Sequence, residues 1–301
     1  MTRLAVVASQ LLLLAVFAGC SGTPAPPSPS APSAAPTTPV ASSPAPVEPT
    51  RTIAKVNVLG VVGDSISLAV NACDQAGPCP AQAWAGGEAP GVESIATRLG
   101  EQFGTRPEVL IAAKDGGDVA DAADRIGRLA AKKPDLVTIL VGANDACAPN
   151  TSEMTEVDDF REQYADVLTQ LADGAPDALA LAMSVPDVNQ IWELGRKDPG
   201  ARQSWSKFWG CRNLLRDPTS DAPQVVASRE AVADRVRDYN EAIAEVCAAA
   251  KNCVSDEAAL NEHDFTSDEV SALDFFHPSK AGQRAIAEIA WNALERQVKL
   301  P

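Results

Sequence analysis

Four short apolar runs after residue 50 constrain the fold more than any other feature of this sequence. They occupy residues 56–62, 108–113, 136–141 and 179–185. None alternates strictly between polar and apolar residues, which is typical of strands buried on both faces, as in a parallel sheet. Amphipathic helical patterns cover 156–173, 228–250 and 280–298. Strands and helices that alternate in this way predict one three-layer αβα domain over residues 52–301.

The N-terminus has the features of an export signal. Arg3 is followed by an apolar stretch over residues 4–17, and small residues precede Cys20. This segment resembles a bacterial lipoprotein signal, which implies cleavage after residue 19, a lipid anchor on Cys20 and a place on the extracytoplasmic face of the membrane. The alternative is ordinary secretion with an unmodified Cys20.

A proline-rich segment separates Cys20 from the domain. Ten of the 30 residues in 21–50 are Pro, and Glu48 is their only charge. A segment without a periodic apolar face cannot pack against a core, so we predict a semi-extended linker over residues 20–51.

Charge and histidine content exclude several classes of function. Lys and Arg number 25 and Asp and Glu 40, a net charge of −15, so we expect no nucleic-acid partner. The chain has only two His residues, His263 and His277. Two histidines are too few for a metal site built from several histidine ligands. We therefore expect no metal and no other cofactor. His263 lies in a charged run and is interpreted as a surface residue.

Six cysteines remain once Cys20 is set aside: Cys73, Cys79, Cys147, Cys211, Cys247 and Cys253. An even number in an exported chain predicts disulfides, for which 15 pairings are possible. Zinc is the competing interpretation, but the domain has no C-x-x-C pair. The simplest prediction is the sequential pairing Cys73–Cys79, Cys147–Cys211 and Cys247–Cys253.

Polar residues that suit acyl transfer follow the predicted strands. Ser65 follows the first run, Gly116 the second and Asn144 the third, while Asp274 and His277 precede the last helical pattern. Ligands of parallel α/β sheets bind at the carboxyl ends of the strands, so we expect these residues to converge. A Ser nucleophile needs a base such as His, the His needs an orienting carboxylate, and the oxyanion needs N–H donors.

These motifs resemble the four blocks of SGNH (GDSL-type) hydrolases, in the order of that family. The blocks are Gly63-Asp64-Ser65, the Gly116 turn, Gly142-Ala143-Asn144-Asp145 and Asp274-x-x-His277. The resemblance implies a flavodoxin-like αβα sandwich with Ser65 as nucleophile, His277 as base and Asp274 as orienting acid. It implies an oxyanion hole formed by Ser65, Asn144 and Gly116, with Gly117 as the alternative to Gly116. The chain is most similar to the phospholipase B-like branch.

Two functions from different classes follow. The first is an extracytoplasmic serine esterase or lipase, a monomer that acts on small-molecule or lipid esters or on O-acyl groups of an envelope polysaccharide. The second is a catalytically silent lipoprotein that binds a glycan or lipid.

Residues 186–227 lack periodicity and hold three of the five Trp. They are interpreted either as a lid or substrate wall or as a disulfide-pinned cover of the core. Asp145 is expected to cap the next turn.

Overall fold

The structure is a computed structural model that describes residues 51–301. The predicted signal peptide 1–19, Cys20 and the linker up to residue 50 lie outside the described residues. Within the described part, no helix is both long and apolar enough to cross a membrane.

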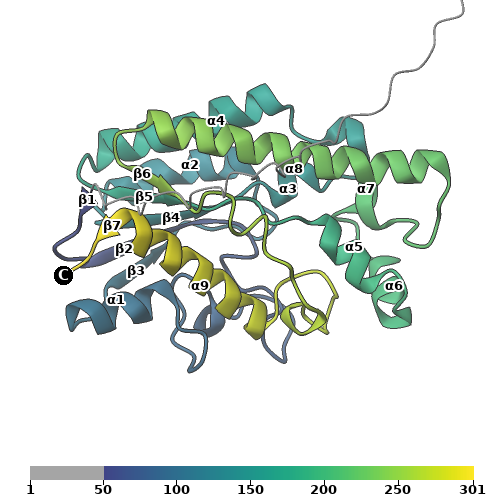
Figure 1. Cartoon of the computed structure of the whole chain (residues 1–301), viewed down its shortest axis with the longest axis horizontal. Helices are drawn as coiled ribbons and strands as arrows, with labels where there is room; N and C mark the ends of the chain where they lie inside the picture. Colours follow the sequence, from purple (N-terminus) through teal and green to yellow (C-terminus); the bar gives the residue numbers. More distant parts are fainter. Residues whose placement is uncertain (1–50) are drawn as a thin grey trace, which may run out of the picture. The chain divides into compact units, whose positions relative to one another are not determined.

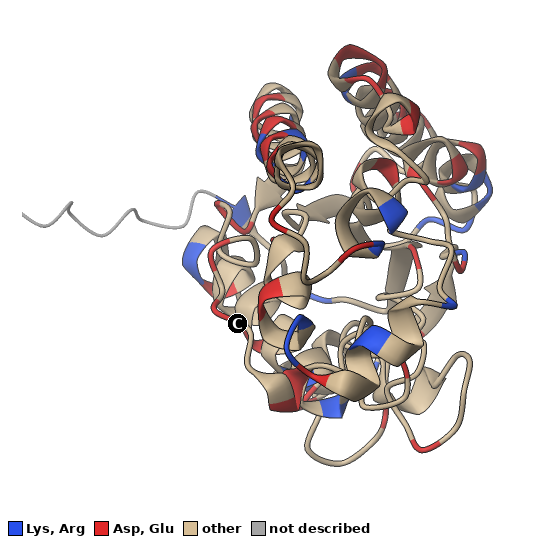
Figure 2. Ribbon diagram, turned by 90° about the vertical axis from the view of Figure 1, so that its right-hand side faces the viewer, with Lys and Arg blue, Asp and Glu red and all other residues tan. Residues whose placement is uncertain are grey.

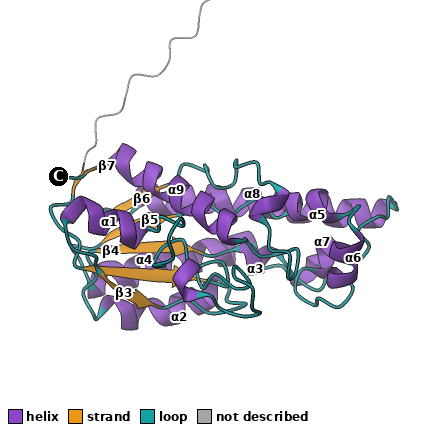
Figure 3. Cartoon of the chain, turned by 90° about the horizontal axis from the view of Figure 1, so that it is seen from below, coloured by secondary structure: helices purple, strands orange, loops and turns teal. Residues whose placement is uncertain are grey.

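The central sheet has five parallel strands in the order β3-β2-β4-β5-β6 (Figure 3). Their bounds are β2 Val58–Gly63, β3 Glu108–Ile111, β4 Leu136–Leu140, β5 Leu179–Ala182 and β6 Cys253–Ser255. A separate two-stranded sheet pairs β1, Arg51–Thr52, with β7, Val298–Lys299. The four predicted strands are therefore present, and β6 is an addition that the sequence analysis missed. Its three residues are too few to show a pattern.

Helices cover both faces of the sheet and make the predicted three layers (Figure 1). The helices of one face are α1 Ile95–Phe103 and α9 Lys280–Gln297, and those of the other are α2 Val119–Ala130, α4 Val157–Gly174 and α8 Pro223–Ala249. Local sequence sets their ends. Asp118 forms a capping box with Asp121 at the start of α2, and Gly104 ends α1 in the left-handed conformation.

The sequence of residues 186–227 predicts no regular structure, and this prediction is wrong. These residues contain three short helices, α5 Asn189–Gly195, α6 Pro199–Trp205 and α7 Arg212–Leu215. Figure 1 shows them together at the end of the molecule beyond β4 and β5. Helices of four to seven residues span too few turns to display a period in sequence, which explains the miss.

The six cysteines of the domain form the sequential pairs Cys73–Cys79, Cys147–Cys211 and Cys247–Cys253. The second pair closes a 64-residue separation and ties α7 to the segment that follows β4. Cross-links between distant segments stabilise a fold mainly by restricting the unfolded chain. In the folded chain, this pair also links the helices of residues 186–227 to the end of β4.

Candidate active site

The first three predicted residues follow three neighbouring strands. Ser65 follows β2, Gly116 follows β3 and Asn144 lies in the short helix α3, Ala143–Ala146, that follows β4. The chain leaves β2 toward β3 on one side and later returns to β4 on the other, so the strand order reverses at β2. Parallel α/β sheets open a crevice at such a reversal. The topology therefore brings these residues to one rim.

Two glycines allow the close approach of backbone at this rim. A Cβ on Gly63 would stand 2.5 Å from the carbonyl oxygen of Leu140, and one on Gly142 would stand 2.5 Å from Val185. Gly142 also has φ +126°, a conformation that side chains rarely adopt. Glycine is thus needed at both positions to set the rim.

Asp274 and His277 lie on the loop before α9 and bind each other. The Nδ1 of His277 lies 2.5 Å from Oδ2 of Asp274. The Oδ1 of Asp274 accepts the backbone N–H groups of Phe276 at 2.9 Å and His277 at 3.1 Å. Burial opposes ionisation of Asp274, but the hydrogen bond and charge of His277, with the other donors, hold the pKa of this carboxyl below its ordinary value. The pair is thus an ionised carboxylate aligned with an imidazole.

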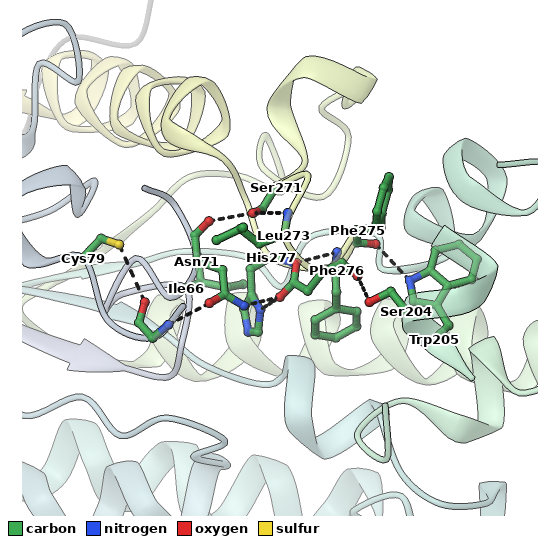
Figure 4. A network of polar contacts seen from close by, with 12 residues as sticks. Ile66, Asn71, Cys79, Ser204, Trp205, Ser271, Leu273, Phe275, Phe276 and His277 are labelled. Atoms are coloured by element: carbon green, nitrogen blue, oxygen red, sulfur yellow. Dashed lines mark hydrogen bonds and ion pairs between the residues drawn. The ribbon is translucent and has the colours of Figure 1, made fainter. Parts of the chain in front are cut away.

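Hydrogen bonds hold this loop on several sides (Figure 4). At its base, Ser271 N donates to the carbonyl of His277 at 2.8 Å. From α6, Ser204 Oγ donates to the carbonyl of Asp274 at 3.1 Å, and the indole N–H of Trp205 donates to that of Phe275 at 3.1 Å. The residues 186–227 therefore support the loop that carries His277.

Gln283 joins α9 to the loop that carries Ser65. Its side chain is fully buried, its Nε2 donates to the carbonyl of Ile66, and its Oε1 accepts the N–H of Trp84, both at 2.9 Å. A buried amide with both ends satisfied fixes the distance between the segments it joins. Gln283 thereby sets the spacing between Ser65 and the loop of His277.

Ser65, Asn144 and His277 all line one pocket. Most of its wall is apolar and comes from three places: the Ser65 loop, α5 and the 265–278 segment. The larger apolar residues are Ile66, Val188, Ile191, Leu194, Phe265, Val270 and Phe276. The two interpretations of residues 186–227 are a lid or substrate wall and a disulfide-pinned cover of the core. Helix α5 lines the pocket, as a substrate wall would. The segment at Cys211 is pinned by its disulfide to Cys147, as a cover would be.

Within residues 51–301, no hydrogen bond joins the side chains of Ser65 and His277. Such contacts are often long in unliganded enzymes and shorten when substrate binds. The backbone N–H groups of Ser65 and Gly116 have no acceptor among the described residues, whereas Gly117 N–H already donates to the carbonyl of Lys114 at 2.9 Å. Of the two glycines, Gly116 is therefore the one whose N–H has no acceptor among the described residues.

Asn144 turns its amide toward this same rim. Its Nδ2 donates to the carbonyl of Gly117 at 2.9 Å and lies 3.4 Å from Oδ2 of Asp64. The second contact is long and therefore weak. One N–H of Asn144 can thus exchange Asp64 for a ligand oxygen while the other remains on Gly117.

The sequence profile of the GDSL-like Lipase/Acylhydrolase family matches residues 61–285, the stretch that runs from β2 through this site into α9. The chain belongs to this family. No curated protein sequence matches it.

Several solved structures are similar to this chain. A GDSL-like lipase candidate from Parabacteroides merdae gives a TM-score of 0.51 at 16% identity, covering 82% of this chain and 100% of that one. An extracellular lipase from Streptomyces rimosus gives 0.48 at 16% identity, and phospholipase A1 from Streptomyces albidoflavus gives 0.49 at 15% identity. Each of these two covers 79% of this chain and 99% of the other.

His263 lies at the surface beside the pocket, where its side chain is 27% exposed, its Nε2 lies 3.3 Å from Glu269 and its ring packs edge-on against Phe265. The expectation about Asp145 is wrong. Asp145 does not cap its own next turn. It is buried, and its carboxylate accepts the N–H of Val119 at the start of α2 and the hydroxyl of Thr155. The contact of Asp145 with Val119 joins residues 26 positions apart, so no local sequence signal points to it.

Asn71 and Gln283 are the supporting residues that sequence reasoning did not find. Each acts across about 200 residues of chain, since Asn71 contacts Asp274 and Gln283 contacts Ile66 and Trp84. A buried-face Gln in an amphipathic helix is the one signal that could have pointed to Gln283. For Asn71 the only hint is its place just before the Cys73–Cys79 pair.

Two buried carboxyls next to the site titrate near neutrality. Burial raises the pKa of Asp64 to about 7, against the hydrogen bond from Ile66 N–H and the charge of His277. Burial likewise raises the pKa of Asp145 to about 7, against the hydrogen bond from Thr155. Both groups are protonated in the folded state at pH values where the unfolded chain has lost the proton.

We expect the free energy of unfolding to fall as pH rises from about 4 to about 7. In this window the folded state binds more protons than the unfolded state, so each carboxyl can contribute a slope of up to about 1.4 kcal/mol per pH unit. Asp145→Asn should flatten the slope, because Asn carries no charge at either end of the window. Denaturant unfolding at several pH values measures how the free energy of unfolding changes with pH. Asp158→Asn, at a side chain that is 96% exposed, is the control. A slope unchanged by Asp145→Asn would contradict the assignment.

Proposed function

We propose that this protein is a serine carboxylic ester hydrolase in which Ser65, His277 and Asp274 form the catalytic triad. The observation that carries the proposal is that one apolar pocket is lined by both Ser65 and His277, while Asp274 binds the far nitrogen of that imidazole. Asn144 lines the same pocket. The shared pocket and the Asp274–His277 contact support a triad of the kind that acyl transfer requires.

The reaction then runs in two halves. Ser65 Oγ attacks the ester carbonyl while His277 Nε2 takes its proton, and the carbonyl oxygen becomes an oxyanion. The N–H groups of Ser65 and Gly116 and the amide of Asn144 stabilise this charge. The C–O bond to the alcohol breaks, and His277 gives its proton to the leaving alcohol. Water, deprotonated by His277, then attacks the acyl-Ser65 ester. The bond to Ser65 Oγ breaks as His277 returns the proton to that oxygen, which releases the carboxylic acid and free Ser65.

The pocket favours an apolar acyl group, since Ile66, Ile191, Leu194 and Phe276 line it beside Ser65. Two carboxylates, Asp187 and Glu269, also line it, and none of its lining residues in the described chain is Lys or Arg. Figure 2 shows both acidic and basic residues on the surface of this end of the molecule. The two carboxylates that line the pocket disfavour anionic groups next to the scissile ester. Lipid acyl esters and O-acyl groups of envelope polysaccharides both fit, and the phospholipase B-like branch is the subclass we propose.

We place the enzyme on the extracytoplasmic face of the membrane, anchored through a lipid on Cys20. The apolar stretch 4–17 followed by Cys20, and the proline-rich 21–50, support this location. Three disulfides in the domain fit an oxidising compartment. Mass spectrometry of the N-terminal peptide from the expressing cell tests the anchor, since an unmodified Cys20 would indicate secretion instead.

Hydrolysis of p-nitrophenyl acetate, butyrate, octanoate and palmitate by the purified protein tests the activity. From acetate to butyrate we expect kcat/KM to rise about tenfold, because each methylene buried in the pocket contributes about 0.8 kcal/mol. A fluorophosphonate should label Ser65, as peptide mass spectrometry would show. No turnover of any ester together with no labelling would instead favour the silent binding protein.

A further inference from the structure

We infer that Asn71 is a positioning residue for the triad and that the Cys73–Cys79 loop acts on catalysis by holding Asn71 in place. The inference rests on the proposed function, because its catalytic consequence requires the Asp274–His277 pair to act as acid and base. It assigns a role to a residue that lies outside the four sequence blocks.

Asn71 binds the same carboxylate oxygen as the catalytic imidazole. Its Nδ2 donates to Oδ2 of Asp274 at 2.6 Å, and His277 Nδ1 lies 2.5 Å from that oxygen. With the N–H groups of Phe276 and His277 on Oδ1, four donors surround the carboxylate. Figure 4 shows Asn71 approaching the 271–277 loop from the side opposite to Ser204. Of the four donors, Asn71 is the one supplied from outside this loop.

The backbone of Asn71 is locked by its surroundings. Its φ is +59°, a left-handed conformation in which Asn is among the most readily accepted residues. Its N–H donates to the carbonyl of Gly77 and its side-chain Oδ1 accepts the N–H of Gly77, both at 2.8 Å. Its own carbonyl accepts the hydroxyl of Ser271 at 2.6 Å. Every polar group of Asn71 is thus engaged.

The Cys73–Cys79 disulfide closes the turn that contains Gly77. Cys79 N–H donates to the carbonyl of Leu68, so the far end of the loop returns to the segment that carries Ser65. Opening this ring would release Gly77, which makes two of the contacts that orient Asn71. We infer that the loop acts on the triad through Asn71, so its effect on catalysis should disappear once Asn71 is replaced.

Without the Asn71 amide, His277 is the one partner left to Oδ2 of Asp274 among residues 51–301, and the carboxylate is held less firmly, by the N–H groups on Oδ1 alone. Triad carboxylates act by fixing the tautomer and orientation of the imidazole, so a mobile carboxylate slows the chemical step more than it weakens substrate binding. A structural residue with no link to the chemistry would leave kcat unchanged in the folded fraction.

Asn71→Ala is the first test, in the full protein with p-nitrophenyl butyrate. We expect kcat to fall about tenfold with KM within about twofold of wild type. Asn252→Ala is the matched control, because its amide donates to the carbonyl of Pro176 away from the site. A folded Asn71→Ala variant with kcat within about twofold of wild type would overturn the inference.

Asn71→Asp separates shape from hydrogen bonding. It keeps the size of Asn but sets a second carboxylate beside Asp274, where only its protonated form can donate. The ratio of its kcat to that of wild type should therefore rise as pH falls. The titratable groups next to position 71 are Asp274 and its partner His277. Across the neighbouring surface hollow lie Asp74, Asp268, Lys280 and Arg284. A ratio that is independent of pH would count against a donor role.

The double variant Cys73→Ser/Cys79→Ser tests the loop. Alone it should lower kcat several-fold, and added to Asn71→Ala it should lower kcat no further, because both changes act through one contact. Losses that multiply would show that the loop acts by another route and overturn that half of the inference.

Proton NMR gives a readout that needs no turnover. The proton between His277 and Asp274 should resonate far downfield, and with two histidines in the chain, His263→Gln assigns it. Asn71→Ala should shift or broaden this resonance, whereas Asn252→Ala should not. If the wild type neither hydrolyses esters nor reacts with a fluorophosphonate, the proposed function fails, and this resonance alone decides the role of Asn71. An unchanged resonance would then refute it.

Discussion

Ser65→Ala and His277→Ala are each expected to lower kcat for ester hydrolysis by at least about 10³-fold while the domain stays folded. Among the described residues that line the apolar pocket, Ser65 is the one hydroxyl nucleophile and His277 the one imidazole. Members of a triad act as a unit, so loss of either removes most of the catalysis that the unit supplies. Steady-state kinetics with p-nitrophenyl butyrate measure the loss, and thermal unfolding checks the fold.

The chain offers a close control for each variant. Ser67 lies two residues from Ser65 and is buried, and its Oγ has no hydrogen-bond partner in the described chain. Ser67→Ala should therefore keep kcat near that of wild type. His263 is the other histidine and binds Glu269 beside the pocket. If His263→Ala abolished turnover while His277→Ala remained active, the assignment of the base would be wrong.

Asn144→Ala is expected to lower kcat by about 10²–10³-fold with little change in KM. The amide would meet an oxyanion that exists only in the transition state, so its loss slows the chemical step without weakening ground-state binding. In the structure the amide points to Gly117 and, more weakly, to Asp64. The second N–H is the one that the oxyanion would take over.

The contact with Gly117 needs a control of its own, because Asn144→Ala also frees the 114–117 turn that carries Gly116. Thermal unfolding and the rate of fluorophosphonate labelling, compared between variant and wild type, report on fold and nucleophile separately. A KM raised at unchanged kcat would show that Asn144 positions the substrate instead.

The residues at the ends of the strands could be predicted because they depend on local pattern and on a general property of parallel sheets. Apolar runs buried on both faces are visible in sequence, and β2, β3 and β4 lie where three of them were expected. Because the carboxyl ends of parallel strands lie at one edge of the sheet, the polar residue that follows each run lies at that edge. His277 needed no geometry at all, since a chain with two histidines offers few choices of base.

Pairings over long distances were decided only by the tertiary structure. An even number of cysteines predicted disulfides, but 15 pairings were possible until the fold set Cys147 beside Cys211. The strand β6 is too short to carry a period, and it takes its place by pairing with β5.

The same holds for the residues that support the site. Gln283 reaches Ile66 across 217 residues, and Asn71 reaches Asp274 across 203. Hydrogen-bond partners of this kind depend on where two distant backbones meet, and a local pattern of residues contains no information about that position. The sequence by itself therefore determined which groups could do the chemistry, and the tertiary structure decided what holds them in place.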